Sequence, residues 1–196
     1  MYPDIPALAI FLFVGAFSPG PNNLLASYSG FNFGIKKTLP LVYGVTFGFP
    51  IVLITVNSGL AIVFNKFPMF QEILKILGSG FLIYMAYKIA FGNKSDEKEI
   101  KNPAKFFNMI IFQFINPKAV LIAIITVSTF ISQNENFVRD SIIVISFAIF
   151  FSFTSIMSWS LLGKFLQRFA NNEIFLTKYN YTMSFLLIIC VIMFYV

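Results

Sequence analysis

Two short polar breaks interrupt apolar segments that are otherwise long enough to cross a membrane. The first, Ser18-Pro19-Gly20-Pro21-Asn22-Asn23, lies inside an apolar run that begins near Ile5, and the second is Asn116-Pro117-Lys118. Proline has no backbone N–H and its ring clashes with the preceding turn, so neither run can continue as an unperturbed helix. In hydrocarbon, freed backbone groups are tolerated only where protein or a water-lined cavity satisfies them. Both breaks are therefore expected to face the protein interior.

The first break has groups that could bind a carboxylate. A helix that begins after Pro21 directs its first amides and the positive end of its dipole at an anion. Asn22 and Asn23 add side-chain donors, directly after Ser18, Pro19 and Gly20 in the sequence. The alternative for this stretch is a proline kink that only shapes helix packing.

Lys118 is the second candidate, because it lies in the middle of the apolar run 106–131. Burial of an ammonium near the bilayer centre costs at least about 2.5–3.5 kcal/mol, so the charge needs a partner. A substrate carboxylate could be that partner, as could carbonyls released at the Asn116-Pro117 break. The structural alternative is a lysine that caps a broken helix or sits in a water-filled vestibule.

Three neighbours of Lys118, namely Gln113, Asn116 and Pro117, complete the predicted substrate site. Hydrogen bonding between helices is the commoner use of an isolated polar side chain such as Gln113. We expect Lys118 and the amides after Pro21 to hold the substrate carboxylate. The side chains of Asn22, Asn23 and Asn116 would orient the other polar groups of the substrate. No catalytic residue is expected.

The elements that would position these residues are membrane helices. Of the 196 residues, 58% are hydrophobic and 11% charged, whereas soluble domains carry about 25% charged residues. Each crossing of a bilayer of about 30 Å needs roughly 20 apolar residues. Six runs approach or exceed this length: about 5–28, 39–64, 70–91, 106–132, 137–162 and 178–196. We therefore predict one all-α integral membrane domain over residues 1–196.

The two breaks divide this domain into comparable halves. Residues 1–91 and 106–196 each hold three runs with the broken run first, and the charged stretch 92–105 forms a cytoplasmic linker. Because three is odd, equivalent helices of the two halves would cross the membrane in opposite directions. We predict six transmembrane helices in two inverted repeats, an arrangement that places a transporter's site where the broken helices meet.

Charge indicates topology rather than a nucleic-acid partner. With the N-terminus outside, ten of the 14 basic residues fall on the inner side and three on the outer side, with Lys118 between them. This positive-inside bias predicts that both termini lie outside. The inner residues are Lys36, Lys37, Lys88, Lys94, Lys98, Lys101, Lys105, Lys164, Arg168 and Lys178; the outer ones are Lys66, Lys75 and Arg139.

Composition disfavours enzymatic chemistry. The sequence has no histidine and one cysteine, Cys190, so neither a zinc or di-metal site nor paired-thiol redox chemistry is expected. We expect no cofactor. The alternative to a transporter is a lipid-handling or structural membrane protein, for which a mid-helix Pro-Gly-Pro and a central lysine would be costly.

The ordered motifs resemble the LysE/RhtB family of bacterial amino-acid exporters. The resemblance is carried by Pro19-Gly20-Pro21-Asn22, by Gly78 and Tyr84 in the third run, and by Asn116-Pro117-Lys118. The stretches SPGPNNLLA and FQFINPKAVLIAIITVSTF are most similar to the cysteine/O-acetylserine efflux subgroup. The resemblance implies efflux of small amino acids or derivatives, of cysteine/O-acetylserine or threonine/homoserine type, across the bacterial inner membrane. It also implies coupling to the proton motive force and a homodimer in the lipid.

One position departs from the family pattern. Many members carry aspartate after the second proline, where this chain has Asn22. An asparagine side chain cannot titrate, so a proton-coupling role does not carry over to this position. The residue that carries the proton stays open.

Overall fold

The computed structural model describes residues 4–60, 66, 68–91, 104–132 and 135–195, so most of the predicted linker 92–105 lies outside the described residues. The described residues form helices joined by short turns, with no strand among them. In order along the chain, the elements are α1 (Ile5–Phe17), α2 (Pro21–Thr55), the π-helical turn η1 (Val56–Leu60), α4 (Pro68–Phe91), α5 (Phe106–Ile115), α6 (Pro117–Phe130), α7 (Phe137–Leu166), the 3₁₀ turn η2 (Gln167–Phe169) and α8 (Glu173–Met193).

Several of these helices can cross a membrane. By length and apolar composition four qualify, namely Pro21–Gly59, Glu72–Phe91, Phe137–Phe169 and Glu173–Met193. A fifth is the pair α5 and α6, which is bent by 70° at its break, while α1 is a shorter apolar helix. The prediction of an all-α integral membrane domain is confirmed at this level.

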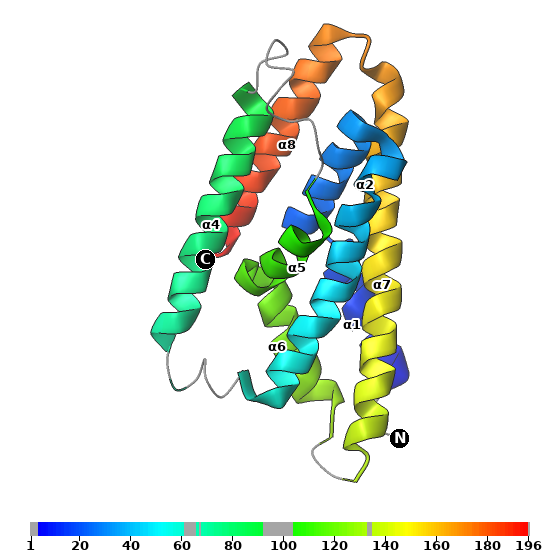
Figure 1. The fold of residues 1–196 in the computed structure, drawn as a ribbon, viewed down its shortest axis with the longest axis vertical. Coiled ribbons are helices and arrows are strands. Elements are labelled where there is room, and N and C mark those ends of the chain that lie inside the picture. The colour runs from blue at the N-terminus through cyan, green and yellow to red at the C-terminus, as the bar shows by residue number, and fades with distance from the viewer. Residues whose placement is uncertain (1–3, 61–65, 67, 92–103, 133–134, 196) are drawn as a thin grey trace.

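The helix α2 doubles back on itself at Gly34. This residue has φ 74° and ψ 169° inside the assigned helix, a conformation that is essentially restricted to glycine. Ser29 Oγ lies 2.9 Å from Thr38 Oγ1, whereas residues nine apart in a straight helix are separated by about 13.5 Å along its axis. Figure 1 shows the chain rising to this point and then descending. We call residues 21–33 the first arm of α2 and residues 35–55 its second arm.

Glycines let α2 approach α7 closely. A Cβ atom at Gly30 would overlap the carbonyl oxygen of Ser160, and one at Gly163 would overlap that of Ser27. The second arm packs on α5 in the same manner, since a Cβ at Gly44 would lie 2.5 Å from the Phe106 carbonyl oxygen. Small residues at such positions let helix backbones approach closely.

Two apolar clusters of buried side chains stand on either side of the breaks. One contains Leu24 after the first break and Phe112 before the second. The other contains Leu12 before the first break and Ala119 after the second. The two breaks therefore lie at the same level of the molecule, between the clusters.

The helix α8 begins earlier than the apolar run that predicted it, because a polar residue caps its N-terminus. The last run was predicted to begin at residue 178, but α8 begins at Glu173. The Asn172 side chain accepts hydrogen bonds from the amides of Ile174 and Phe175, at 2.9 and 3.1 Å. This N-cap starts the helix ahead of its apolar stretch.

Candidate functional site

The two breaks lie against each other, and Lys118 connects them. Its ammonium donates to Ser18 Oγ at 2.8 Å, to the Ser18 carbonyl oxygen at 3.0 Å and to the Pro19 carbonyl oxygen at 3.3 Å. Lys118 is in the first turn of α6, and helical side chains lean toward the N-terminus of their helix. Its charge therefore reaches the C-terminal end of α1, where the helix dipole is negative.

The carbonyls that partner Lys118 belong to the first break. The sequence had suggested carbonyls released at Asn116-Pro117, and that suggestion is wrong for the observed conformation. Gly20 provides the space, because a Cβ atom there would lie 2.9 Å from Lys118 Nζ. Since the Gly20 φ of −177° is open to any residue, the glycine serves to leave room for the observed position of the Lys118 side chain.

The other carbonyls at the end of α1 are also satisfied by side chains. Asn23 Nδ2 donates to the carbonyl oxygens of Ala16 at 2.7 Å and Ser18 at 2.9 Å. Two residues of α7 contribute as well: Ser155 Oγ donates to the Ala16 carbonyl at 2.8 Å and Trp159 Nε1 to the Phe17 carbonyl at 3.3 Å. Side-chain donors from α2, α6 and α7 thus satisfy the backbone carbonyl oxygens that the first break leaves without helical partners.

Asn22 and Gln113 form a second connection between the broken segments. Asn22 Nδ2 donates to Gln113 Oε1 at 2.8 Å, and Gln113 Nε2 donates back to Asn22 Oδ1 at 3.2 Å. Gln113 Nε2 also donates to the Met109 carbonyl at 2.8 Å, and the Gln113 side chain is fully buried. Every polar atom of Gln113 therefore has a partner within the protein.

The two helices that begin at the breaks differ in their N-terminal caps. Asn116 caps α6, because its Oδ1 accepts from the Lys118 amide at 3.2 Å, and Pro117 is the first helical residue. In α2 the cap is Gly20, which makes no side-chain hydrogen bond, and Pro21 follows. The first amides of α2 are consequently without a side-chain acceptor at the cap.

A small cavity lies between the breaks. The central cavity has a volume of about 60 Å³, which is room for about two water molecules. Its polar lining includes Asn22, Asn23, Gln113, Asn116 and Lys118. Seven of the ten predicted site residues line this cavity, namely Gly20, Pro21, Asn22, Asn23, Gln113, Asn116 and Lys118. The other three, Ser18, Pro19 and Pro117, do not line it.

The sequence-based prediction missed the contribution of α7. Ser152 and Ser155 both line the central cavity, and Trp159 donates to the first break. Residues three and four apart share one face of a helix. The spacing of these polar side chains in the fifth run was the available signal, but nothing in their residue types distinguishes them from other serines in apolar helices.

Two larger cavities adjoin the breaks. We call the one lined by the beginning of α4 the lower cavity and the one lined by the later part of α4 the upper cavity, because α4 runs upward in Figure 1. The lower cavity, of about 680 Å³, is lined by Ser18, Lys118 and Cys190 among others. The upper cavity, of about 420 Å³, is lined by Tyr84, Phe112 and other residues of α2, α4 and α5. Lys118 lines the central and lower cavities but not the upper one.

A buried carboxylate lies elsewhere. Asp140, in the first turn of α7, is fully buried and forms a 3.1 Å ion pair with Arg139. It also accepts hydrogen bonds from the amide and hydroxyl of Ser132. Asp140 lines none of the three cavities, so its contacts hold the start of α7 rather than a substrate site.

Broken apolar helices that meet around a cavity with polar side chains in its lining are typical of secondary transporters. The chain belongs to the LysE type translocator family, whose profile matches residues 13–196. The "Cysteine/O-acetylserine efflux protein" of Salmonella paratyphi A is 27% identical over 192 residues, covering 96% of this chain and 95% of the relative. The protein of the same name from Escherichia coli K12 is 24% identical with the same coverage. No solved structure matches.

Proposed function

We propose that this protein exports small amino acids or their derivatives, of the cysteine/O-acetylserine or threonine/homoserine type, across the bacterial inner membrane. The observation that carries the proposal is the ammonium of Lys118 at the meeting point of two broken helices. Membership of the LysE type translocator family and relatives named for cysteine/O-acetylserine efflux support it. Coupling to the proton motive force and homodimer formation remain predictions from the family resemblance.

The proposed architecture has six crossings in two inverted repeats. The crossings are α1 with the first arm of α2, the second arm, α4, the pair α5 and α6, α7, and α8. The reversal at Gly34 supports two crossings within α2. Helices in equivalent positions also pack together: Tyr43 of the second arm stacks on Phe153 of α7 at 6.3 Å, and α4 packs on α8.

In this proposal the substrate carboxylate accepts hydrogen bonds from the Lys118 ammonium and from the first amides of α2. Lys118 now donates to uncharged oxygens of Ser18 and Pro19, and a carboxylate is a stronger acceptor for an ammonium than a carbonyl. A central cavity of about 60 Å³ is too small for an amino acid. Substrate binding at this level therefore requires the helices around the breaks to separate.

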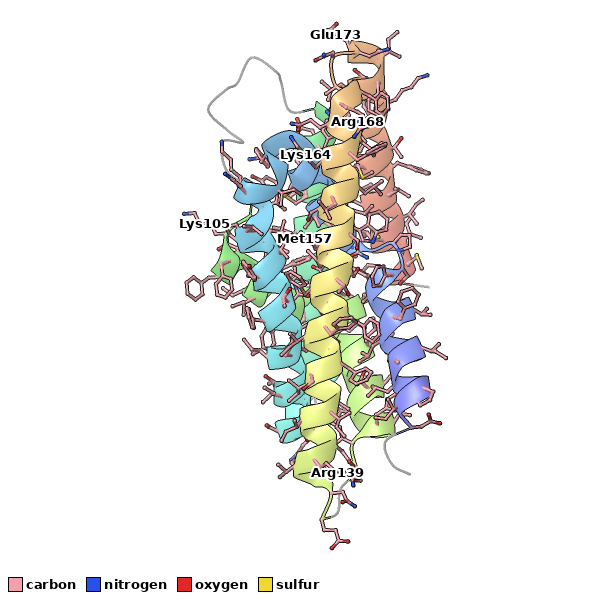
Figure 2. The ribbon with its side chains drawn as sticks, turned by 90° about the vertical axis from the view of Figure 1, so that its right-hand side faces the viewer. Lys105, Arg139, Met157, Lys164, Arg168 and Glu173 are labelled. Carbon is pink, nitrogen blue, oxygen red and sulfur yellow. The ribbon has the colours of Figure 1, made fainter. Side chains whose placement is uncertain are left out.

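The proposed orientation places both termini outside. Figure 2 shows Lys105, Lys164 and Arg168 toward one end of the molecule and Arg139 at the other. The more basic end would face the cytoplasm under the positive-inside rule. An alkaline phosphatase fusion at the C-terminus should be active and a fluorescent-protein fusion dark; the reverse result would contradict this orientation.

Transport into inverted membrane vesicles tests the function and its site. Vesicles with the wild-type protein should accumulate at least one of cysteine, O-acetylserine, threonine and homoserine. The Lys118→Ala and Asn22→Ala variants should lose most of this transport, whereas Lys178→Ala, which changes an exposed residue of α8, should retain it. The site assignment is wrong if both site variants keep wild-type rate and apparent affinity at equal protein levels.

A further inference from the structure

The upper and lower cavities both lie between α4 and other helices, and α8 also lines the lower one. Both are lined by α4 on one side and by α5 or α6 on the other. Along α4, Lys75 lines the lower cavity and Phe81 the upper one, with Gly78 between them. The two cavities therefore approach each other end to end at the level of Gly78.

A close backbone contact separates the two cavities. A Cβ atom at Gly78 would overlap the carbonyl oxygen of Ile115, the last residue of α5, and would lie 3.6 Å from Pro117 Cδ. Ile115 lines the upper cavity and Pro117 the lower one. The second break thus contacts α4 at Gly78, the buried glycine of this helix.

The helices α4 and α8 form a unit through contacts along their length. Ser184 Oγ donates to the Ala86 carbonyl oxygen at 2.7 Å, and Ser79 Oγ donates to the Tyr195 hydroxyl at 3.2 Å. The rings of Phe91 and Tyr181 add an edge contact at 6.3 Å. One helix comes from each half of the chain, so this unit does not coincide with either proposed repeat.

Near the breaks, α4 contacts α5 through an aromatic pair and a close backbone approach. Phe81 of α4 packs on Phe112 of α5 with ring centroids 4.8 Å apart, next to the contact of Gly78 with Ile115. Aromatic and backbone van der Waals contacts of this sort lack the directional hydrogen bonds that join α4 to α8. At this level they can open without leaving a buried polar group unpaired. Elsewhere the unit is joined to α2 by the buried hydrogen bond between the hydroxyls of Tyr179 in α8 and Ser27, 3.1 Å apart.

We propose that the substrate route runs between the α4–α8 unit and the other helices, and that the contact of Gly78 with the Ile115 carbonyl is its gate. The inference rests on the proposed export function. In the observed conformation Lys118 is reached from the lower cavity. Movement of α4 away from the second break joins the lower cavity to the upper one and gives the substrate carboxylate on Lys118 a way through.

Cross-linking with a bifunctional thiosulfonate reagent tests the gate. Because Cys190 is the sole cysteine, a Cys190→Ala background carries no other thiol. The gate pair is Phe81→Cys with Phe112→Cys, and the matched control is Phe91→Cys with Tyr181→Cys, a ring contact within the unit. Vesicle transport is measured with radiolabelled O-acetylserine, threonine and homoserine, which carry no thiol, before linking, after linking and after reduction.

Linking the gate pair should lower transport at least about tenfold and reduction should restore it, whereas linking the control pair should leave transport within about twofold. Unchanged transport after complete linking of the gate pair would overturn the proposal. So would a block by the control link, which would indicate that the two halves of the chain move against each other. If vesicles with unlinked protein transport none of the three compounds, the proposed function itself fails for them, and the gate with it.

Discussion

The ammonium of Lys118 lies 2.8 Å from Ser18 Oγ and 3.0 Å from the Ser18 carbonyl oxygen, across 100 positions of the sequence. A single side chain at the beginning of α6 thereby satisfies the end of α1. This contact brings a positive charge to the level where both helices are broken.

Removal of the Lys118 charge should destabilise the protein as well as impair transport. In Lys118→Met, the carbonyl oxygens of Ser18 and Pro19 lose their charged donor, at a cost of about 1.5–3 kcal/mol in the free energy of unfolding. The thermal midpoint in detergent should fall relative to wild type. Lys178→Met, at an exposed position, is the control, and equal midpoints for the two variants would contradict the capping role.

The amide pair of Asn22 and Gln113 should behave as a coupled unit. Asn22→Leu and Gln113→Leu each leave a partner without its hydrogen bonds, at a cost of about 1–3 kcal/mol. The double variant removes both partners, so its loss should be smaller than the sum of the single losses by about 1 kcal/mol. Thermal midpoints of the four proteins measure this coupling, and strictly additive losses would exclude it.

Glycines at the contact of α2 with α7 should tolerate no side chain. Gly30→Ala and Gly163→Ala each place a methyl group against a backbone carbonyl, which should cost about 1–3 kcal/mol or more. Gly80→Ala is the matched control, because a Cβ there meets open space and alanine favours a helix by up to about 1 kcal/mol. Expression level and thermal midpoint should separate the two classes of variant.

The reversal of α2 should depend on Gly34. Its φ of 74° with ψ of 169° lies in a region that costs a side-chain-bearing residue about 1–3 kcal/mol. Gly34→Ala should therefore lower the thermal midpoint even though a Cβ there has ample room, its nearest neighbour being Lys164 Nζ at 3.9 Å. A midpoint equal to that of wild type would mean that this backbone conformation is not retained.

Some features of the fold follow from local sequence patterns and others do not. The breaks at Pro19-Gly20-Pro21 and Asn116-Pro117 were predictable, since proline interrupts a helix wherever it stands. The separate runs 5–28 and 39–64 predicted a change of direction between them, but not that a single residue, Gly34, would make it. Asn116 was expected to orient substrate, and the structure shows it as the cap of α6.

By itself the sequence determined the apolar helices and the positions of their breaks, because hydropathy and the missing N–H of proline are local properties. Its ordered motifs resembled the family to which the chain belongs. Only the tertiary structure decided which groups satisfy the broken ends. Lys118, Ser155 and Trp159 lie 99 or more positions from the carbonyls they bind. Those pairings depend on the registers in which helices pack, and in α2 and α7 that register follows from backbone contacts at Gly30 and Gly163.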